Sequence, residues 1–392
     1  MNDSFDVDDS LKIPPDPILG LSKLFSEDKR KNKIDAGIGV FRDENGKTFT
    51  PDAIKLAYKS LDIGLGDYLN PTGEEEYLGD RTFLIESSKL VFGKSNLNFA
   101  SAGTPGGTGG VALAFDLFKA LFPNSPIVLG VPTWINHLQI AKSRKIEVLT
   151  FAHIRENKFD IDGQIKAIKN SPKNSLVVFH CGKTHNPTGS NPSSKKEWQS
   201  LAKVMENRIA FFDAPYAGFG DGLTEDLEPI RIFMNQGVNL SAAISFAKNG
   251  GIYKERPGVL FIPASSKKQA LELQRLMNSI ARVAYSSPPA LGERLIAKVL
   301  STPKLFKLWT IELAMSAEIL KQRREILSKE IPEFYFVKDQ VGLFSILPLT
   351  EKQVEKLRKE HGIYLSLSGR VNFGGITKSD MKRFANAIKN IL

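Results

Sequence analysis

Residues 176–189 read LVVFHCGKTHNPTG, and residues 208–216 read RIAFFDAPY. In both stretches a short apolar run, of the length of a strand buried on both faces, turns polar where it ends. The same alternation continues along the middle of the chain, with apolar runs at 126–129, 146–151 and 242–246 and helical patterns at 111–122 and 195–205. Strands that alternate with helices indicate a mostly parallel sheet covered by helices. We therefore predict an α/β fold in which these segments form a large domain.

The two ends of the chain have a different pattern. A long charged helical pattern covers 308–327, and strand patterns at 334–337, 342–347 and 370–373 then alternate with helical patterns at 351–360 and 378–392. This alternation predicts a smaller α+β domain. Three prolines among residues 14–17 disfavour a helix, so residues 10–24 are expected to be an extended arm. The predicted division is an N-terminal arm at 1–15, a small domain of 16–45 and 312–392, and a large domain at 46–311.

The composition is that of a globular protein, since 42% of the 392 residues are hydrophobic and 24% are charged. The net charge of +10 comes from 53 basic and 43 acidic residues that are interleaved along the chain. We therefore expect a solvated basic surface and no nucleic-acid partner. A cleft that gathers positive charge for anionic substrates is the alternative. No apolar run approaches the ~20 residues of a membrane span, so no membrane partner is expected.

The cysteine content limits the cofactor classes and the cellular location. Cys181 is the only cysteine, which excludes an intramolecular disulfide framework and a multi-cysteine metal site. No metal site is predicted. The N-terminus is acidic and lacks the basic flank and apolar stretch of a signal peptide. We therefore expect the protein to work in the cytoplasm.

Polar side chains of several kinds follow the predicted strands. Asn186 comes after the run at 176–179, Asp213 and Tyr216 come after 208–212, Lys248 follows 242–246, and Trp134 follows 126–129. Ligands of parallel sheets bind beyond the carboxyl ends of the strands. We therefore expect an amide, a carboxylate, a phenol, a lysine and an indole to meet at one site.

A glycine-rich stretch adds a further element. Residues 103–110 read GTPGGTGG and lead into the helical pattern at 111–122. Glycines before a helix leave backbone N–H groups bare for a phosphate. The two nucleotide motifs do not match, because no Lys-Ser or Lys-Thr follows the last glycine and Gly-x-Gly-x-x-Gly is not completed. A phosphate that is not a nucleotide's remains possible, and a loop of purely structural role is the alternative.

A lysine at a strand end, facing a phosphate loop and a carboxylate, suggests pyridoxal phosphate held covalently by that lysine. Lys248 would bind the cofactor and move the substrate proton, and Asp213 would keep the pyridine nitrogen protonated. Tyr216 and Asn186 would bond the phenolic oxygen, and Trp134 would stack on the ring. We predict Lys248, Asp213 and Tyr216 as the catalytic residues. In isolation, such an aspartate is usually a helix cap and such a lysine a surface residue.

Three arginines strengthen this hypothesis. Arg256 lies eight residues after Lys248 and could clamp the cofactor phosphate, and Arg370 precedes a strand pattern of the small domain and could bind the substrate α-carboxylate. Arg282 stands shortly before a rigid Pro-Pro pair. A solvated arginine or a surface ion pair is the alternative for each.

The chain resembles the class I aspartate and aromatic amino acid aminotransferases, which are pyridoxal-phosphate enzymes of fold type I. The motifs that carry this resemblance keep their order and spacing along almost the whole chain; they lie at 14–20, 37–47, 66–69, 104–109, 132–137, 185–189, 213–219, 248, 253–256, 285–289 and 368–370. The resemblance implies a homodimer with active sites shared between subunits and an N-terminal arm that reaches over the partner.

The resemblance also assigns roles to single residues. His137 matches the histidine behind the aspartate, and Arg370 matches the α-carboxylate clamp. Gly39 matches the mobile segment that closes on substrate, and Arg282 matches the residue that binds a dicarboxylate's distal group from the partner subunit. The residues that match phosphate ligands are Gly107, Thr108, Ser245, Arg256 and Tyr68, the last of which reaches the neighbouring subunit. Asn186 and Trp134 match positions that contact both cofactor and substrate.

Several positions depart from the family pattern; Lys183-Thr184 replace small residues before His185, and residues 70–72 replace a smaller loop after Tyr68. Ala247 stands where similar enzymes carry a hydroxyl that touches the phosphate, which implies weaker cofactor retention. Gly250 replaces a common phenylalanine, and Ser287 replaces an asparagine that often accompanies the distal arginine. Most departures surround the substrate entrance, so they bear on substrate choice more than on the reaction.

The predicted function is reversible transfer of the amino group of an L-amino acid, first of all aspartate, to 2-oxoglutarate. Two arginines match the two carboxylates of a dicarboxylic substrate. Aromatic transamination is the close alternative, because the distal arginine of similar enzymes can swing aside. A lyase or decarboxylase on the same scaffold, or a binding protein without catalytic activity, are the further alternatives.

Overall fold

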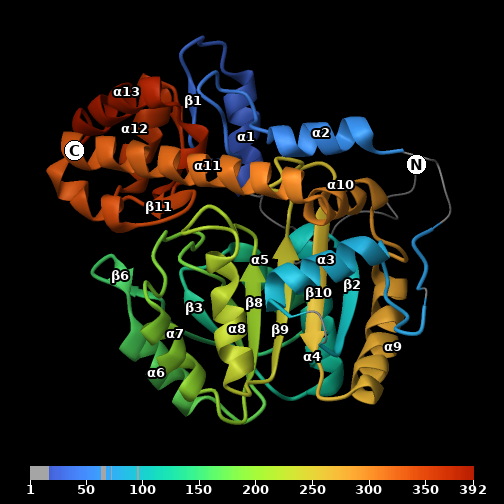
Figure 1. The fold of residues 1–392 in the computed structure, drawn as a ribbon. Helices are drawn as coiled ribbons and strands as arrows, with labels where there is room; N and C mark the ends of the chain where they lie inside the picture. Colours follow the sequence, from blue (N-terminus) through green and yellow to red (C-terminus); the bar gives the residue numbers. More distant parts are fainter. Residues whose placement is uncertain (1–16, 63–67, 72, 95–96) are drawn as a thin grey trace, which may run out of the picture.

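A seven-stranded sheet forms the centre of the molecule in the computed structural model, which describes residues 17–62, 68–71, 73–94 and 97–392 (Figure 1). In sheet order the strands are β2 Phe99–Pro105, β10 Pro257–Pro263, β9 Leu240–Ser245, β8 Ile209–Ala214, β7 Leu176–His180, β3 Ile127–Val131 and β4 Val148–Ala152. Strand β10 pairs antiparallel with β2 and β9, and the other pairings of this sheet are parallel. The predicted α/β fold with a mostly parallel sheet is therefore confirmed.

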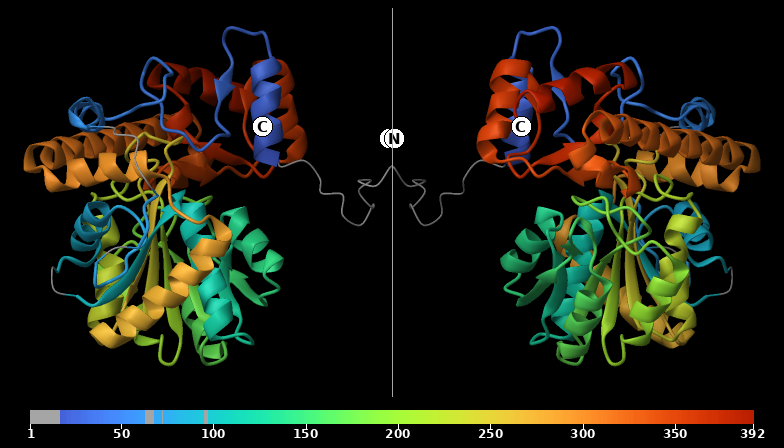
Figure 2. Two further views of the ribbon diagram at one scale, coloured as in Figure 1. Left: turned by 90° about the vertical axis from the view of Figure 1, so that its right-hand side faces the viewer. Right: turned by 90° about the vertical axis from the view of Figure 1, so that its left-hand side faces the viewer.

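Helices cover both faces of this sheet (Figure 2). They are α3 Arg81–Phe92, α4 Gly106–Leu121, α5 Ile135–Ser143, α6 Ile161–Asn170, α7 Lys195–Lys203, α8 Glu228–Asn235, α9 Lys267–Ala284 and α10 Ala290–Ser301. Successive residues of β8 lie on opposite faces of the sheet and belong to different hydrophobic cores. Phe211 packs with Phe115 of α4, whereas Phe212 packs with Phe233 of α8. This double burial explains why the strands read as continuous apolar runs instead of alternating ones.

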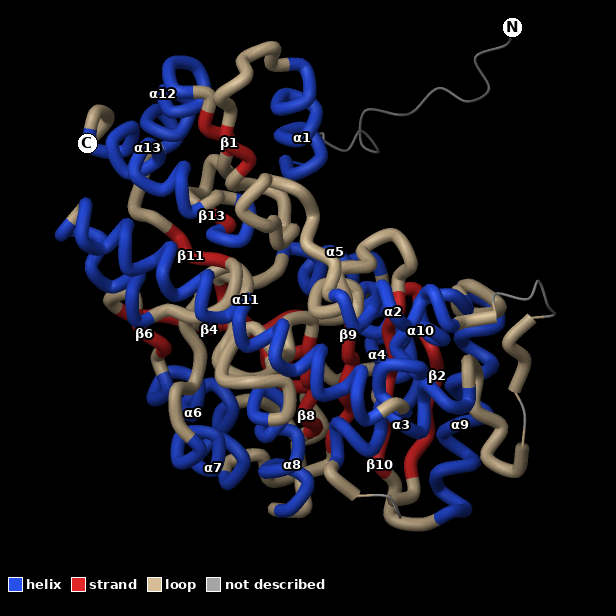
Figure 3. The backbone as a smooth tube through the Cα atoms, turned by 45° about the horizontal axis from the view of Figure 1, so that its top comes forward, coloured by secondary structure: helices blue, strands red, loops and turns tan. Residues whose placement is uncertain are grey.

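A second set of elements, here called the cap elements, combines both ends of the chain (Figure 3). These are α1 Pro17–Glu27, β1 Ile34–Asp35, η3 Pro332–Asp339, β11 Phe344–Ile346, α12 Glu351–His361, β12 Ile363–Tyr364, β13 Arg370–Asn372, η4 Phe373–Gly375 and α13 Lys378–Lys389. Strand β1 pairs in parallel with β12, and β11 pairs antiparallel with β13. The cap elements therefore bring residues near 35 beside residues near 364 and 372.

Four further features complete the described part of the fold. They are α2 Asp52–Ser60, the hairpin of β5 Ile154–Arg155 and β6 Lys158–Phe159, η2 Glu225–Leu227 and the 28-residue α11 Pro303–Glu330. Helix α11 lies across the molecule between the cap elements and the sheet (Figure 1). The boundary that we placed at residue 312 falls inside this helix, and the domain division remains a prediction. Within the described ranges, no helix is both long and apolar enough to cross a membrane.

Two local predictions were wrong. Residues 17–24, expected to be extended, belong to α1, because a proline is compatible with the first turn of a helix, where its missing N–H leaves no bond unmade. The strand expected at 334–337 belongs to the 3₁₀-helix η3. Its buried Phe334 and Val337 are three residues apart, the repeat of a 3₁₀-helix. The arm predicted at 1–15 lies outside the described residues.

Candidate active site

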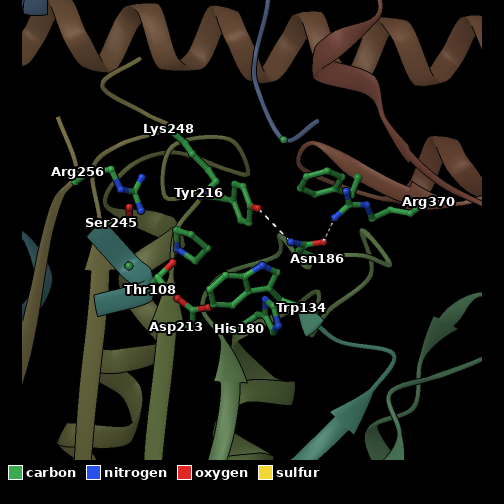
Figure 4. Close-up of a pocket in the computed structure, with 14 residues that line it drawn as sticks. Thr108, Trp134, His180, Asn186, Asp213, Tyr216, Ser245, Lys248, Arg256 and Arg370 are labelled. Atoms are coloured by element: carbon green, nitrogen blue, oxygen red, sulfur yellow. Dashed lines mark hydrogen bonds between the residues drawn. The ribbon is translucent and has the colours of Figure 1, made fainter. Parts of the chain in front are cut away.

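The predicted site residues gather at the carboxyl ends of β7, β8 and β9 (Figure 4). They line a cavity of about 150 Å³ whose walls are Gly39, Gly107, Thr108, Trp134, His180, Asn186, Asp213, Pro215, Tyr216, Ser245, Lys248, Phe344, Arg256 and Arg370. The parallel register places His180 beside Asp213 and Asp213 beside Ala243. Because parallel strands end at one edge, side chains distant in sequence meet there.

The amine of Lys248 lies near the Tyr216 ring, the Asp213 carboxylate and the Arg256 guanidinium. Its Nζ is 4.9 Å from the centroid of the Tyr216 ring. Removal of the amine from bulk water lowers the pKa of Lys248 to about 8, although the nearby Asp213 carboxylate acts in the opposite direction and Arg256 in the same one. A lysine with a lowered pKa is a better nucleophile and proton acceptor near neutral pH.

Asp213 is held from behind by a buried histidine. His137 of α5 is fully buried, and its Nε2 lies 3.1 Å from Asp213 Oδ2. Since a carboxylate oxygen accepts, the imidazole donates through Nε2, and its Nδ1 is left to accept from Thr133 Oγ1 at 2.9 Å. The hydrogen bonds therefore fix the orientation of the carboxylate at the floor of the pocket.

Asn186 joins the phenol and the guanidinium of the site. Its Nδ2 donates to the Tyr216 hydroxyl, and Arg370 Nη1 donates to its Oδ1, both at 3.4 Å. Burial raises the pKa of Tyr216 above its ordinary value. The Arg370 guanidinium also donates to Gly37 O at 2.8 Å and lies 4.8 Å from the centre of the Phe344 ring. Arg370 is thus held by both groups of elements at the mouth of the cavity.

The N-terminus of α4 supplies an anion cradle. Gly106 N donates to Arg256 O at 2.7 Å, and no side chain caps the helix, which leaves the N–H groups of Gly107 and Thr108 at the cavity wall for an anion. Gly106 has φ +71°, and a Cβ there would overlap the Arg256 guanidinium; a Cβ at Gly107 would lie 3.1 Å from Ser245 Cβ. Arg256 Nη1 donates to Tyr253 O at 3.2 Å, and burial lowers the pKa of Arg256. A helix terminus without a side-chain cap beside such an arginine fits a phosphate.

Two predicted residues lie away from this cavity. Tyr68 is 76% exposed, and Arg282 is exposed and donates to Ser286 Oγ at 2.7 Å. Tyr68 lines a separate hollow with Tyr285 and Ser287, and Ser287 Oγ accepts a hydrogen bond from Leu69 N at 3.2 Å. The chain therefore presents both residues on one outer face rather than in its own pocket.

The sequence interpretation missed three residues of the cavity wall: His180, Pro215 and Phe344. His180 and Pro215 stand next to the predicted strand ends, so their position in the sequence could have indicated them. Phe344 comes from β11, far along the chain, and an apolar residue in a short strand carries no signal of its own. Ala247, the departure beside the lysine, is buried and donates its N–H to Ser245 Oγ at 3.4 Å.

Four of the five histidines form a buried cluster of ring contacts, here called the histidine stack, which reaches the cavity wall at His180. The ring centroids of His137 and His180 are 5.2 Å apart, those of His180 and His185 are 4.0 Å apart, and those of His185 and His153 are 3.7 Å apart. Burial lowers the pKa of His153 to about 4, and it lowers the pKa of His180 and His185 well below 6.5. The imidazoles of these three residues are therefore neutral at pH 7.

The stack makes stability sensitive to mild acid. The unfolded chain protonates these imidazoles near pH 6.5, whereas the folded chain does not, so the free energy of unfolding falls as pH falls below 6.5. We expect a loss of about 2 kcal/mol for His153 alone between pH 7 and pH 5. Urea denaturation at pH 7, 6 and 5 measures it, and His153→Phe, which cannot be protonated, should lose less stability. A free energy that does not change with pH would contradict the neutral stack.

The chain is similar to known proteins over its whole length. The family model of class I and II aminotransferases matches residues 31–388. The aspartate aminotransferase of Escherichia coli is 34% identical over 396 residues, which cover 97% of this chain and 98% of that protein. The tyrosine aminotransferase of Rhizobium meliloti is 34% identical over 389 residues, with 96% and 97% covered. Among solved structures, an aromatic-amino-acid aminotransferase from Burkholderia pseudomallei, covalently bound to pyridoxal phosphate, has a TM-score of 0.90, 29% identity and 99% and 98% coverage.

Proposed function

This chain belongs to the class I and II aminotransferases, and we propose that it transfers the amino group of an L-amino acid, first of all L-aspartate, to 2-oxoglutarate. The observation that carries this proposal is the amine of Lys248, which lies in one cavity with Asp213, Tyr216 and a helix N-terminus that no side chain caps. Aromatic amino acids are the second candidate substrates, because relatives of both kinds match the chain over its full length.

The residues present fit pyridoxal 5'-phosphate. The cradle of Gly107, Thr108, Ser245 and Arg256 suits its phosphate, Trp134 suits a stacked ring, and the Asp213 carboxylate suits a protonated ring nitrogen. Tyr216 and Asn186 are placed to bond the phenolic oxygen. When bound, the cofactor supplies an electron sink for the electrons of the substrate's broken Cα–H bond.

The side chains of the protein would bind the cofactor, transfer the substrate proton and align the substrate. Lys248 is proposed to bind the cofactor. Its amine, with a pKa of about 8, would then accept the proton from the substrate Cα and deliver it to the cofactor carbon C4′, and would move it the other way in the reverse half-reaction. The Arg370 guanidinium binds the α-carboxylate and so aligns the Cα–H bond. Gly39 lies against the Phe344 ring, where a Cβ would come within 3.1 Å of Cζ, so the segment can cover the mouth of the cavity closely.

The second carboxylate of L-aspartate needs a second cation, and we propose Arg282 of the partner subunit. Arg282, Tyr68 and the 90% exposed Val283 lie on the outside of the chain, although a valine and a tyrosine favour burial. A homodimer with shared active sites would cover these side chains and complete the substrate site. We also propose a cytoplasmic location, which the single, buried Cys181 supports.

Subunit mixing tests the shared site. In a hybrid of one Lys248→Ala subunit and one Arg282→Ala subunit, one of the two sites combines an intact Lys248 with an intact Arg282 from its partner. Random mixing should restore about a quarter of the parent activity with L-aspartate, because half of the dimers are hybrids with one native site each. Activity is measured after co-refolding, beside each variant refolded alone. Mixtures no more active than the average of the two variants would show that the sites are not shared.

The absorbance spectrum tests the function itself. The purified protein, loaded with pyridoxal phosphate, should show a visible band that L-aspartate removes and 2-oxoglutarate restores. Parallel rates with L-phenylalanine rank the two substrate classes. Loss of a β-substituent or of CO₂ without a keto-acid acceptor would favour the lyase or decarboxylase alternative, and absence of any band would favour a binding protein.

A further inference from the structure

His153 lies at the end of β4 and outside the walls of the cavity, yet it contacts the loop that carries Asn186. It is 5% exposed and belongs to the histidine stack described above. Its Nε2 lies 2.8 Å from Ser190 O. A carbonyl oxygen only accepts, so Nε2 carries the proton and Nδ1 is bare.

The ring of His153 is fixed on both sides. On one side it stacks on His185, with the ring planes 14° apart and the centroids 3.7 Å apart. Gly130 of β3 lies close to it, since a Cβ there would come within 3.0 Å of His153 Nδ1, and the Phe159 ring lies 5.2 Å from it. His153 therefore has little freedom to move, so it can restrict the motion of the residues that it contacts, His185 and Ser190.

The contacts of His153 reach both ends of one short loop. His185 begins the loop and Ser190 ends it. Within the loop, Gly189 N donates to His185 O at 2.9 Å and Thr188 Oγ1 donates to Ser190 O at 3.0 Å. Between these ends stands Asn186, whose amide joins Tyr216 to Arg370 (Figure 4).

We propose that His153 is a positioning residue that holds the 185–190 loop so that the Asn186 amide faces Tyr216 and Arg370 in the correct orientation. The stacking of His153 on His185 fixes the position of the start of the loop, and the hydrogen bond from His153 to Ser190 O fixes the position of its end. Both Asn186 bonds are 3.4 Å long, so a small shift of the loop breaks them. The catalytic consequence rests on the proposed function, because Asn186 there bonds the cofactor's phenolic oxygen.

Three substitutions separate the two contacts. His153→Phe keeps the ring and loses the donor, His153→Gln keeps a donor and loses the ring, and His153→Ala loses both. In the holoenzyme we expect His153→Ala to raise the pH midpoint of the visible absorbance band by about one unit, since the Asn186 donor stabilises a deprotonated oxygen. The KM for L-aspartate should rise about tenfold, with a smaller change in kcat, and the other two variants should show part of each effect.

A matched control separates positioning from loss of stability. Phe233→Leu alters a fully buried side chain of helix α8 that packs on Phe179 and Trp198, neither of which belongs to the 185–190 loop. It should lower Tm and leave the midpoint of the band and the KM unchanged. A His153→Ala enzyme with the midpoint and KM of the parent would overturn the proposal.

A second readout needs no cofactor. In the cofactor-free chain, hydrogen exchange of a peptide that covers 185–190 should be at least about tenfold faster in His153→Ala than in the parent, while a peptide from β9 exchanges at the parent rate. Equal exchange of the loop peptide overturns the proposal even if the parent binds no pyridoxal phosphate. If the parent forms no visible band, faster exchange of the loop peptide in His153→Ala than in that parent would support the positioning role of His153 and reject the proposed function.

Discussion

Lys248→Ala should abolish transamination and remove the visible absorbance band of the cofactor-loaded protein. The amine is the group in the cavity placed both to bind the cofactor and to move the substrate proton, so its loss removes two functions at once. We expect the rate with L-aspartate to fall by about 10⁴-fold or more. Stopped-flow absorbance after mixing with L-aspartate measures the remaining rate in a single turnover.

A neighbouring lysine provides the control for this substitution. Lys254 is exposed, six residues further along the chain, and lines no part of the cavity. Lys254→Ala should therefore keep the band and the rate of the parent. A Lys248→Ala protein that still forms the band and turns over L-aspartate would show that another amine carries the reaction. A Lys248→Ala protein that binds the cofactor but forms no visible band would show that cofactor affinity does not require covalent attachment to Lys248. This outcome is expected if the phosphate cradle, which the substitution leaves intact, supplies the affinity.

Much of the site could be predicted because the sheet is parallel. Asp213 lies near the end of β8 and Lys248 follows the neighbouring strand β9, and parallel strands end at the same edge of the sheet. An apolar run followed by a polar residue therefore predicts both a strand and the place of a site residue. The glycine-rich stretch is visible in the sequence as well, but the predicted helix begins at 111, whereas α4 begins at Gly106 and the glycines form its first turn.

The contributions of the cap elements could not be predicted by this route. Phe344 and Gly39 reach the cavity because the two ends of the chain pair through β1 and β12, a contact between positions more than 300 residues apart. Local patterns contain no signal for such a pairing. The histidine stack shows the same limit, because the side chain of His153 meets His185 only after β4 and β7 take places on either side of β3.

Tyr68 and Arg282 illustrate a third kind of limit. Their roles came from a resemblance, and one chain alone places both side chains on its surface. The structure of a single chain is therefore compatible with the shared site without completing it. For this reason the subunit-mixing experiment, rather than a substitution in one chain, decides between a shared and a self-contained active site.

Arg370→Gln should lower kcat/KM for L-aspartate by about 10²- to 10³-fold and leave the visible band in place. The guanidinium offers two parallel donors to a carboxylate, and the amide of glutamine offers neither the charge nor the fork. Arg370→Lys keeps the charge but not the fork, so it should recover only part of the loss. Steady-state kinetics with both substrates, together with the absorbance spectrum of each variant, measure these effects.

A pair of substrates distinguishes loss of carboxylate binding from general damage to the site. Arg370 also donates to Asn186 and to Gly37 O, so its removal could disturb the cavity as well as the substrate. L-phenylalanine and 2-phenylethylamine differ only by the α-carboxylate. If Arg370 binds that group, the substitution slows the reaction with L-phenylalanine and leaves the slow reaction with the amine unchanged. Equal losses with both compounds would instead assign Arg370 to the architecture of the cavity. Arg208→Gln, which alters an arginine bonded to Ser171 outside the cavity, should leave both reactions at the parent rate.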